Sequence, residues 1–353
     1  MADLPSDAIA QRLSVKWIRK LGKGGYGEVF EAVDLSTNKH VAIKAVHLSS
    51  RPGSRKADIR KEVDLQQAVG HHPNIVRVIK KACWDNDTYW ICMELCKGGD
   101  LYDVIEDHRI QNQHIQEHSI WSWFSQLVLG LQACHQPESR TGANADTRII
   151  VHRDLKPDNI FFNEDLTVAK IGDFGMAREL KEEEWATSFC GTLTHMAPEM
   201  LVEGQTPLYD ERVDLWALGC ILYQLCSLDY AFDHPDDNTL KHKIRTERPA
   251  PIPAHYSRSL ADLVDALLFA DASKRPDLDQ LIAHPGVQLG IVMNTARESA
   301  SHMIRLEQEN EQQAHILKQA ETLAKTLQAQ LAEQTAKYQG MFTQGKTRID
   351  ALE

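Results

Sequence analysis

Residues 152–159 are His152-Arg153-Asp154-Leu155-Lys156-Pro157-Asp158-Asn159, and Asp173-Phe174-Gly175 follows closely. The two motifs place two acids, a lysine and an asparagine at short, fixed spacings. Phosphoryl transfer from a nucleotide needs such groups: one to orient a hydroxyl, a positive charge for the phosphate, and ligands for magnesium. An apolar run with one buried aspartate would explain any single piece, but the full set in this order favours the chemical explanation.

The composition is that of an ordinary globular chain with an acidic excess. The 353 residues are 42% apolar and 25% charged, and 39 basic against 50 acidic side chains give a net charge of −11. An acidic chain argues against non-specific binding to nucleic acid or to an anionic membrane surface. We therefore expect neither among its partners.

The cysteines and the apolar runs predict the cellular environment. The seven cysteines include no Cys-x-x-Cys pair, so their spacing predicts neither a zinc site nor a disulfide framework. The first residues do not predict a signal peptide, and no apolar run has the length of a membrane span. We expect a reducing compartment: the cytoplasm, the nucleus or both.

The hydrophobic periodicity divides the chain into parts. Residues 13–91 are mainly strand-like with one helical interval at 57–69, and the chain becomes mainly helical after Gly98-Gly99. Residues 136–148 are polar and rich in turn residues, which predicts an exposed loop. The expected organisation is a polar lead-in over 1–12, a bilobal α+β domain over 13–285, and a linker with a helical, coiled-coil-like tail over 286–353.

A glycine-rich turn precedes the second predicted strand. It reads Gly22-Lys23-Gly24-Gly25-Tyr26-Gly27-Glu28-Val29, and its glycines would let backbone N–H groups approach phosphate oxygens. A plain glycine hairpin or a dinucleotide-binding turn would show the same glycines. The order strand, turn, strand argues against the dinucleotide fold, in which a helix follows the turn. No Gly-Lys-Ser/Thr follows, so the turn is not a Walker loop.

Val41-Ala42-Ile43-Lys44 places a lysine in an apolar strand. An edge-strand lysine that faces water is the simpler explanation. With a glycine loop upstream, we favour a lysine whose ammonium binds the α- and β-phosphates and is held by a carboxylate on a helix. Glu62, on the predicted helix 57–69, is the candidate partner.

Three further motifs follow in order: Ala197-Pro198-Glu199, residues 214–219 and Lys274-Arg275-Pro276. With them, residues 13–285 resemble the eukaryotic protein kinase catalytic domain. The resemblance implies a bilobal kinase fold that uses ATP and Mg²⁺ to phosphorylate protein substrates. It also implies that Arg275 pairs with Glu199 in a structural role, and a buried charge that loses its partner is costly.

The resemblance assigns roles to the catalytic-loop residues. Asp154 would orient the substrate hydroxyl and accept its proton, and Lys156 would neutralise charge on the γ-phosphate. Asn159 and Asp173 would hold magnesium. A lysine two residues after the aspartate is typical of the kinases that act on serine and threonine.

The same resemblance implies where ATP binds. Adenine would bond to the backbone of Glu94 and Cys96, with Met93 as gatekeeper, Val29 and Ala42 above the ring and Phe161 below it. The full ATP-binding set is then Leu21, Gly22, Lys23, Gly24, Gly25, Tyr26, Gly27, Val29, Ala42, Lys44, Met93, Glu94, Cys96 and Phe161.

Finer features resemble the NIMA-related kinases. These are the hinge at residues 93–101, the activation-segment motif at residues 186–192 and the helical tail, while the insert before His152 is similar to that of the fungal members. Two departures stand out. Residues 193–199 differ from the usual Pro-Tyr-Tyr-Met-Ser-Pro-Glu, and Gln66 occupies a position where kinases usually carry an apolar side chain that stacks toward the Phe of Asp-Phe-Gly. A buried glutamine needs hydrogen-bond partners.

Regulation and specificity also follow from the resemblance. Because Arg153 precedes the catalytic aspartate, phosphate on the activation segment is expected to switch activity, with Ser188 as the first candidate site and Thr187 as the second. The alternative is that Ser188 is only a loop serine. Thr192 would pack near the catalytic loop and define hydroxyl specificity. Asp100 and Asp158 stand where acids can contact a basic residue upstream of the acceptor in related kinases, which predicts some tolerance for an upstream arginine. Met176, directly after Asp-Phe-Gly, would favour serine as the acceptor.

Two alternatives remain open at this stage. A pseudokinase scaffold that works through its tail is disfavoured because Lys44, Asp154, Asn159 and Asp173 are all present, and the kinase-specific motifs disfavour a small-molecule kinase.

The tail could be a homodimer interface, a solvated single helix or a disordered segment. The tail shows a heptad pattern with polar interruptions, which can fix the register of a coiled coil. One seam position contains Leu306, Ala320, Leu327 and Met341, and the other contains Met303, Leu317, Ala324, Leu331 and Tyr338. Physiological substrates, pathway and upstream activator have no signature in the sequence.

Overall fold

The computed structural model describes residues 4–24, 27–48, 56–136, 149–180, 192–202 and 209–350. The chain divides into two compact units, Met1–Met293 and Asn294–Glu353. Several predictions concern residues outside the described ranges: Gly25 and Tyr26 of the glycine turn, nearly all of the polar insert, and the phosphosite candidates Thr187 and Ser188.

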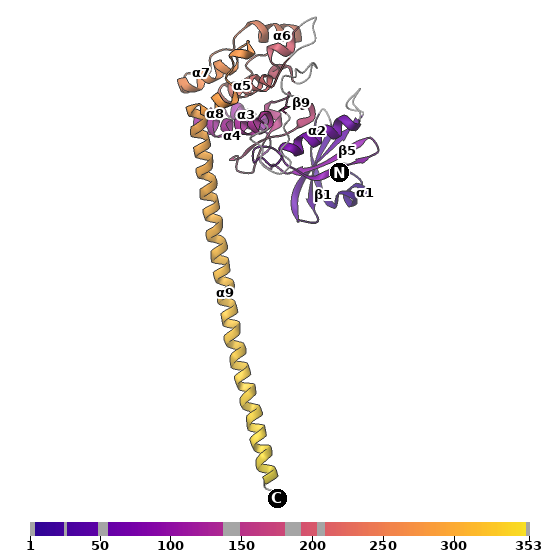
Figure 1. The fold of residues 1–353 in the computed structure, drawn as a ribbon, viewed down its shortest axis with the longest axis vertical. Coiled ribbons are helices and arrows are strands. Elements are labelled where there is room, and N and C mark those ends of the chain that lie inside the picture. Colours follow the sequence, from indigo (N-terminus) through magenta and orange to yellow (C-terminus); the bar gives the residue numbers. More distant parts are fainter. Residues whose placement is uncertain are drawn as a thin grey trace. The chain divides into compact units, whose positions relative to one another are not determined.

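An antiparallel sheet with the strand order β1-β2-β3-β5-β4 forms the smaller lobe of the first unit (Figure 1). On β3, Val41 and Ile43 are buried on one face, and Lys44 points to the other, as the two-residue period of a strand requires. Helix α2, Lys56–Val69, contributes Ile59 to the apolar cluster on the face of Lys44. The strands are β1 Val15–Gly24, β2 Gly27–Asp34, β3 Lys39–His47, β4 Val78–Asp85 and β5 Thr88–Glu94.

The polar lead-in contains a helix. Helix α1, Asp7–Leu13, buries Ile9 and Leu13 in the apolar cluster on the opposite face of the sheet, together with Phe30 and Trp90. Two apolar residues four positions apart lie on one face of a helix, which explains why so polar a segment still packs. The lead-in therefore contributes to the core of the smaller lobe.

Helices α3 to α8 form the larger lobe (Figure 1). Nearly every residue of α5 and most residues of α4 are buried, as expected for helices that are apolar on all sides. The bilobal kinase fold predicted from the sequence is confirmed. The helices are α3 Leu101–Ile110, α4 Glu117–His135, α5 Arg212–Ser227, α6 Asp237–Thr246, α7 Arg258–Leu267 and α8 Leu278–Ala283.

Short strands and single 3₁₀ turns carry the residues between these helices. Strand β6 pairs with β9, and β7 pairs with β8, both antiparallel. The segments are β6 Ile149–Val151, η3 Pro157–Asn159, β7 Ile160–Phe162, β8 Ala169–Ile171, η4 Phe174–Met176, β9 Arg178–Leu180, η5 Leu193–His195, η6 Pro198–Leu201 and η7 Ala272–Lys274.

Helix α9, Pro285–Asp350, starts within the first unit. Its first turns pack tightly on α4: a Cβ added at Gly286 would lie 2.4 Å from the Trp121 ring, and one at Gly290 would lie 2.2 Å from the Trp121 carbonyl oxygen. Val287 is fully buried between them. The first part of the predicted linker and tail, 286–353, is therefore helical, and Gly286, Val287 and Gly290 pack against the larger lobe.

The second unit consists of the rest of α9. Its described side chains from 298 to 343 are all exposed, including large apolar ones such as Leu317, Leu331 and Tyr338. Within the described residues, no helix combines the length and the apolar character that a membrane span needs.

Candidate active site

Asp214 anchors the catalytic loop from below. Its fully buried carboxylate accepts hydrogen bonds from the backbone N–H groups of His152 and Arg153, both at 2.8 Å, and its Oδ2 lies 2.8 Å from His135 Nε2. Burial raises the pKa of Asp214, but the hydrogen bond and charge of His135 outweigh it, and the pKa falls below its ordinary value. The ionised side chain thus holds two consecutive backbone groups of the loop. The sequence offered one signal, a charged residue inside the most apolar helix.

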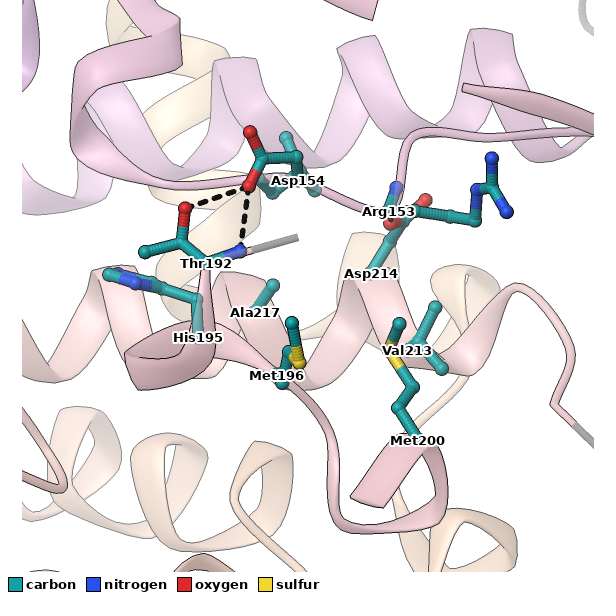
Figure 2. A pocket seen from close by; sticks show the side chains of 10 residues that line it. Arg153, Asp154, Thr192, His195, Met196, Met200, Val213, Asp214 and Ala217 are labelled. Carbon is teal, nitrogen blue, oxygen red and sulfur yellow. Dashed lines mark hydrogen bonds between the residues drawn. The ribbon is translucent and has the colours of Figure 1, made fainter. Parts of the chain in front are cut away.

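Asp154 lies at the centre of a hydrogen-bonded cluster (Figure 2). Its Oδ1 accepts from both N and Oγ1 of Thr192, each at 2.9 Å. Lys156 Nζ lies 3.3 Å from Asp154 Oδ2 and donates to Thr192 Oγ1 at 2.8 Å. Asn159 Nδ2 donates to the Asp154 carbonyl at 2.7 Å and reaches Oδ2 at 3.2 Å. The structure thus brings together four residues that the sequence placed in the site.

Backbone conformation fixes the loop against the Asp-Phe-Gly segment. Arg153 and Asp173 both have positive φ, 66° and 53°, which is uncommon for residues with a side chain. Arg153 Nε donates to the carbonyl of Met176 at 2.6 Å. Residues held in this region concentrate at functional sites. Here the Arg153–Met176 hydrogen bond connects the catalytic loop to the Asp-Phe-Gly segment.

Lys44 and Asp173 form an ion pair across the lobes, with 2.6 Å between Nζ and Oδ1. Asp173 Oδ1 also accepts from the N–H of Gly175. Glu62 lies half-buried on α2, and its predicted pairing with Lys44 stays a prediction. The ammonium from the smaller lobe is therefore next to the carboxylate predicted to hold magnesium.

Asn159 and Asp173 are suited to a hard cation. The Asn159 amide donates to Asp154, which leaves its carbonyl oxygen as an acceptor, and the N–H of Gly172, beside Asp173, donates to the Asn159 backbone carbonyl at 2.9 Å. Amide and carboxylate oxygens are ligands that Mg²⁺ prefers, with phosphate oxygens and water completing its shell. Among the described residues, no group of three or more His, Cys, Asp or Glu is arranged to hold a metal ion.

The predicted adenine site is assembled from both lobes. Ala42 is the cross-strand partner of Met93, and Val29 is that of Lys44, so these side chains share one face of the sheet. Strand β7, which carries Phe161, is joined to Gly98 and Gly99 of the hinge segment by two backbone hydrogen bonds of 2.9 Å. The predicted roof residues thus share one face of the sheet, and the predicted floor residue lies on a strand that is hydrogen-bonded to Gly98 and Gly99.

Gly27 has a structural role that the sequence did not reveal. Its φ is +154°, and an added Cβ would lie 1.7 Å from the carbonyl oxygen of Ala45 on β3. No such contact constrains Gly22, where an added Cβ meets nothing within 4 Å. Of these two, Gly27 is required by the pairing of β2 with β3.

Comparison with known proteins decides the family. The profile described as protein kinase domain matches residues 15–287. The chain belongs to the protein kinase family. Its relatives include the serine/threonine-protein kinase nekl-2 of Caenorhabditis elegans, 31% identical over 76% of this chain and 72% of that protein. Nek5 of Mus musculus is 34% identical over 82% of this chain and 43% of its own length, and G2-specific protein kinase nimA of Emericella nidulans is 31% identical over 80% and 42%. The kinase thus spans about two fifths of Nek5 and nimA.

The kinase contains the ion pair that its family resemblance implies between Glu199 and Arg275. The two guanidinium Nη atoms lie 2.6 and 2.7 Å from the two carboxylate oxygens, and the Arg275 side chain is fully buried. Arg275 also donates to the backbone carbonyls of Phe269 and Arg212. A bidentate pair with these further acceptors satisfies the buried guanidinium.

In this kinase η5 is held in place by the buried His195, which lies in the segment 193–199 that departs from the family pattern. His195 Nε2 lies 2.9 Å from Gln224 Oε1 on α5, and Nδ1 lies 3.0 Å from Thr194 Oγ1. Since the amide oxygen can only accept, Nε2 carries the proton and Nδ1 accepts from the threonine hydroxyl. Burial lowers the pKa of His195 to about 4, so the ring is neutral at pH 7. Figure 2 shows His195 beside Thr192.

Gln66, the second departure, is buried and hydrogen-bonded. Its Nε2 donates to the carbonyl of Val76 at 2.8 Å. His152 and Phe174 meet edge to face, with ring centroids 4.9 Å apart. The predicted need of a buried glutamine for a partner is thus met by the backbone that precedes β4.

Proposed function

We propose that this kinase transfers the γ-phosphoryl group of ATP to serine and threonine hydroxyls of proteins, as a NIMA-related kinase. The main support for this proposal is the cluster around Asp154, in which Lys156, Thr192 and Asn159 lie within hydrogen-bonding distance of one another or of Asp154. The Lys44–Asp173 pair adds the groups expected to meet the phosphates and magnesium. Magnesium bound with ATP would offset the negative charge of the phosphates.

Each residue of the cluster has a distinct task. Asp154 Oδ1 accepts two hydrogen bonds of 2.9 Å from Thr192, whereas Oδ2 has only longer contacts, 3.2 Å to Asn159 and 3.3 Å to Lys156. Oδ2 is therefore the oxygen that orients the acceptor hydroxyl and takes its proton. The hydroxyl oxygen bonds to the γ-phosphorus as the bond from that phosphorus to the bridging oxygen of ADP breaks. Lys156 neutralises charge on the moving phosphoryl group, and Lys44 orients the α- and β-phosphates.

The test is transfer of labelled phosphate. The 353-residue chain with Mg²⁺ and γ-labelled ATP should label casein on serine and threonine and not on tyrosine, and a chelator should stop the reaction. A pseudokinase scaffold predicts no transfer, although its tail could still bind partners. Phosphoamino acid analysis separates the serine/threonine assignment from a tyrosine kinase.

We also propose that a phosphate at Ser188, or at Thr187 as second candidate, activates the kinase. Support comes from Arg153, whose guanidinium lies beside η4 and reaches the Tyr209 hydroxyl at 3.4 Å, so a cation borders the segment that follows Asp-Phe-Gly. A phosphate adds a charge of about −1.5 to −2 that can pair with such a cation. Full specific activity of the unphosphorylated T187A/S188A double variant would exclude this switch.

A second copy of the chain is the proposed partner of α9. Met303 and Leu306 mark the two seam positions of the heptad pattern. Along residues 296–343, these positions contain only apolar, small or uncharged polar side chains. Every Asp, Glu, Lys and Arg of that stretch lies at another heptad position. Leu317, Leu327 and Leu331 on this seam are 55–65% exposed. Such a stripe on a long helix is typical of a coiled coil.

Point variants of the full chain test this pairing. Sedimentation should give a dimer for the wild type and a monomer for L317K/L327K/L331K. The matched control Q319K/T326K/A329K adds the same charge off the seam and should remain dimeric. A monomeric wild type at micromolar concentration would exclude the homodimer.

A cell-cycle role in the cytoplasm or nucleus, and a relationship to the fungal members, complete the proposal. The similarity to nimA of Emericella nidulans, a G2-specific protein kinase, supports a cell-cycle role. Phosphoproteomes of cells with active kinase and with the D154N variant, compared through the cell cycle, would test it. Equal phosphorylation throughout the cycle would argue against that role.

A further inference from the structure

An ion pair joins the two lobes behind the hinge. Lys170 Nζ, on β8, lies 3.0 Å from Glu94 Oε1, at the end of β5. The two side chains are only 17% and 23% exposed. Such shielding strengthens the attraction between opposite charges relative to a pair in open solvent.

The Glu94 carboxylate has a second donor in the smaller lobe. The N–H of Arg77 donates to Oε1 at 2.7 Å, and the N–H of Glu94 donates in return to the Arg77 carbonyl at 3.0 Å. One carboxylate oxygen therefore connects the segment before β4 with the lysine of β8. A charge-assisted bond from each lobe fixes its position.

The segment before β4 is also attached to β8 directly. The N–H of Ile171 donates to the Asn74 carbonyl, and the N–H of Val76 donates to the Ile171 carbonyl, both at 2.8 Å. Asn74 Nδ2 donates in addition to the carbonyl of Ala169. Strand β8 and residues 74–77 thus form one connected layer, and the Lys170–Glu94 pair connects that layer to the hinge.

Strand β8 is next to two predicted parts of the active site, the floor of the adenine site and the Asp-Phe-Gly segment. Lys170 is the cross-strand partner of Phe161, the predicted floor of the adenine site, and it precedes Asp173 by three residues. Glu94 contributes its backbone to the predicted adenine contact. The pair therefore joins the element that would bind the base to the element that would bind the metal.

We propose that Lys170 and Glu94 are positioning residues that hold the hinge at a fixed distance from β8, and so set the affinity of the cleft for MgATP. This inference rests on the proposed function, since it concerns the same ATP site. Neither side chain touches the reacting atoms in this scheme. Their loss should weaken nucleotide binding and leave the Asp154 cluster intact.

The charges of Lys170 and Glu94 also act on neighbouring titratable groups. Burial, with a further contribution from the Glu94 carboxylate, raises the pKa of the hinge thiol Cys96 to about 12, and Lys170 opposes this rise. Burial and the Lys170 cation lower the pKa of His72. Lys170 is thus electrostatically coupled to groups in both lobes.

The experiment compares MgATP affinity, measured by calorimetry, with kcat on a fixed protein substrate. K170M should raise the Kd and KM for MgATP about 5- to 10-fold, the size of a modest coupling between sites, with kcat within about 2-fold. E94Q should show a similar loss of affinity, because it keeps the shape of the side chain but not its charge. The charge-swapped E94K/K170E should recover part of the affinity.

The matched control is Lys97, a residue of the same hinge segment, which forms an exposed pair with Glu164 at 3.4 Å, with side chains 52% and 78% exposed. K97M should bind MgATP like the wild type. Wild-type affinity in folded K170M and E94Q would overturn the inference, and so would equal losses in K97M. If K170M does not fold, E94Q and the swap decide. A wild type that neither binds nor turns over MgATP would instead refute the proposed function.

Discussion

Thr192 donates two hydrogen bonds to the same oxygen of Asp154, from its backbone N and from Oγ1, each 2.9 Å long. Lys156 donates to the same hydroxyl at 2.8 Å. The hydroxyl of Thr192 is therefore both donor to the carboxylate and acceptor from the lysine, so it fixes the geometry between them. This arrangement connects the end of the activation segment to the catalytic loop.

Thr192→Val should lower kcat by about 10- to 100-fold. It removes the hydroxyl and with it the hydrogen bonds to Asp154 and Lys156, while the shape of the side chain stays the same. One hydrogen bond to a charged group is worth about 1.5–3 kcal/mol. Thr192→Ser keeps the hydroxyl and should keep most of the activity. Steady-state kinetics with the MgATP Kd as control would check this; equal kcat in wild type and T192V would show that the hydroxyl does not matter.

Arg275→Met should destabilise the larger lobe by about 3–5 kcal/mol, because it leaves Glu199 without its fully buried partner. The control is Arg258→Met, since Arg258 pairs with Asp262 on the surface, with side chains 89% and 56% exposed, and its loss should cost less than about 1 kcal/mol. Urea unfolding measures both. Similar costs for the two variants would contradict the structural role of the buried pair.

The buried His195 predicts a pH dependence of stability. Its folded pKa is about 4, below the ordinary value of 6.5, so the unfolded chain binds its proton first as the pH falls. This histidine should therefore stabilise the fold by about 2 kcal/mol less at pH 5 than at pH 7. Urea unfolding of wild type and H195Q at both pH values isolates the contribution of His195 to the free energy of unfolding. The same pH sensitivity in H195Q would contradict the assignment.

Substrate preference should also depend on pH. Burial, assisted by the charges of Asp103 and Asp158, raises the pKa of Asp100 to about 6, so its carboxylate loses its charge as the pH falls from 7.5 to 5.5. An upstream arginine in a peptide should then improve kcat/KM more at pH 7.5 than at 5.5, and Asp100→Asn should remove that difference. A peptide array with no preference for arginine at either pH would refute the role of Asp100.

The motifs predicted the fold and the central cluster because each motif carries its chemistry in a few neighbouring residues. Asp154, Lys156 and Asn159 lie within one turn and loop, and their gathering follows from local geometry. The sequence could not predict that Asp214, about 60 residues later, would hold the backbone of that loop, because this contact depends on how α5 packs.

Long-range packing explains the other differences. The pairing of His195 with Gln224 joins residues 29 positions apart on different elements, and no local pattern announces it. The helix at residues 7–13 could not be predicted, because the segment is polar and only Ile9 and Leu13 are buried. Lys44 pairs with Asp173, 129 residues away, a contact that its strand pattern does not contain.

The most direct test of the account compares wild type and Asp154→Asn for two properties, phosphate transfer to casein and MgATP binding. Asp154 is assigned to the acceptor hydroxyl and not to the nucleotide. The account therefore predicts a fall in transfer of about 10²- to 10⁴-fold with an unchanged Kd for MgATP and an unchanged unfolding midpoint. Transfer by purified D154N at the wild-type rate would contradict the assignment of Asp154 as the catalytic residue.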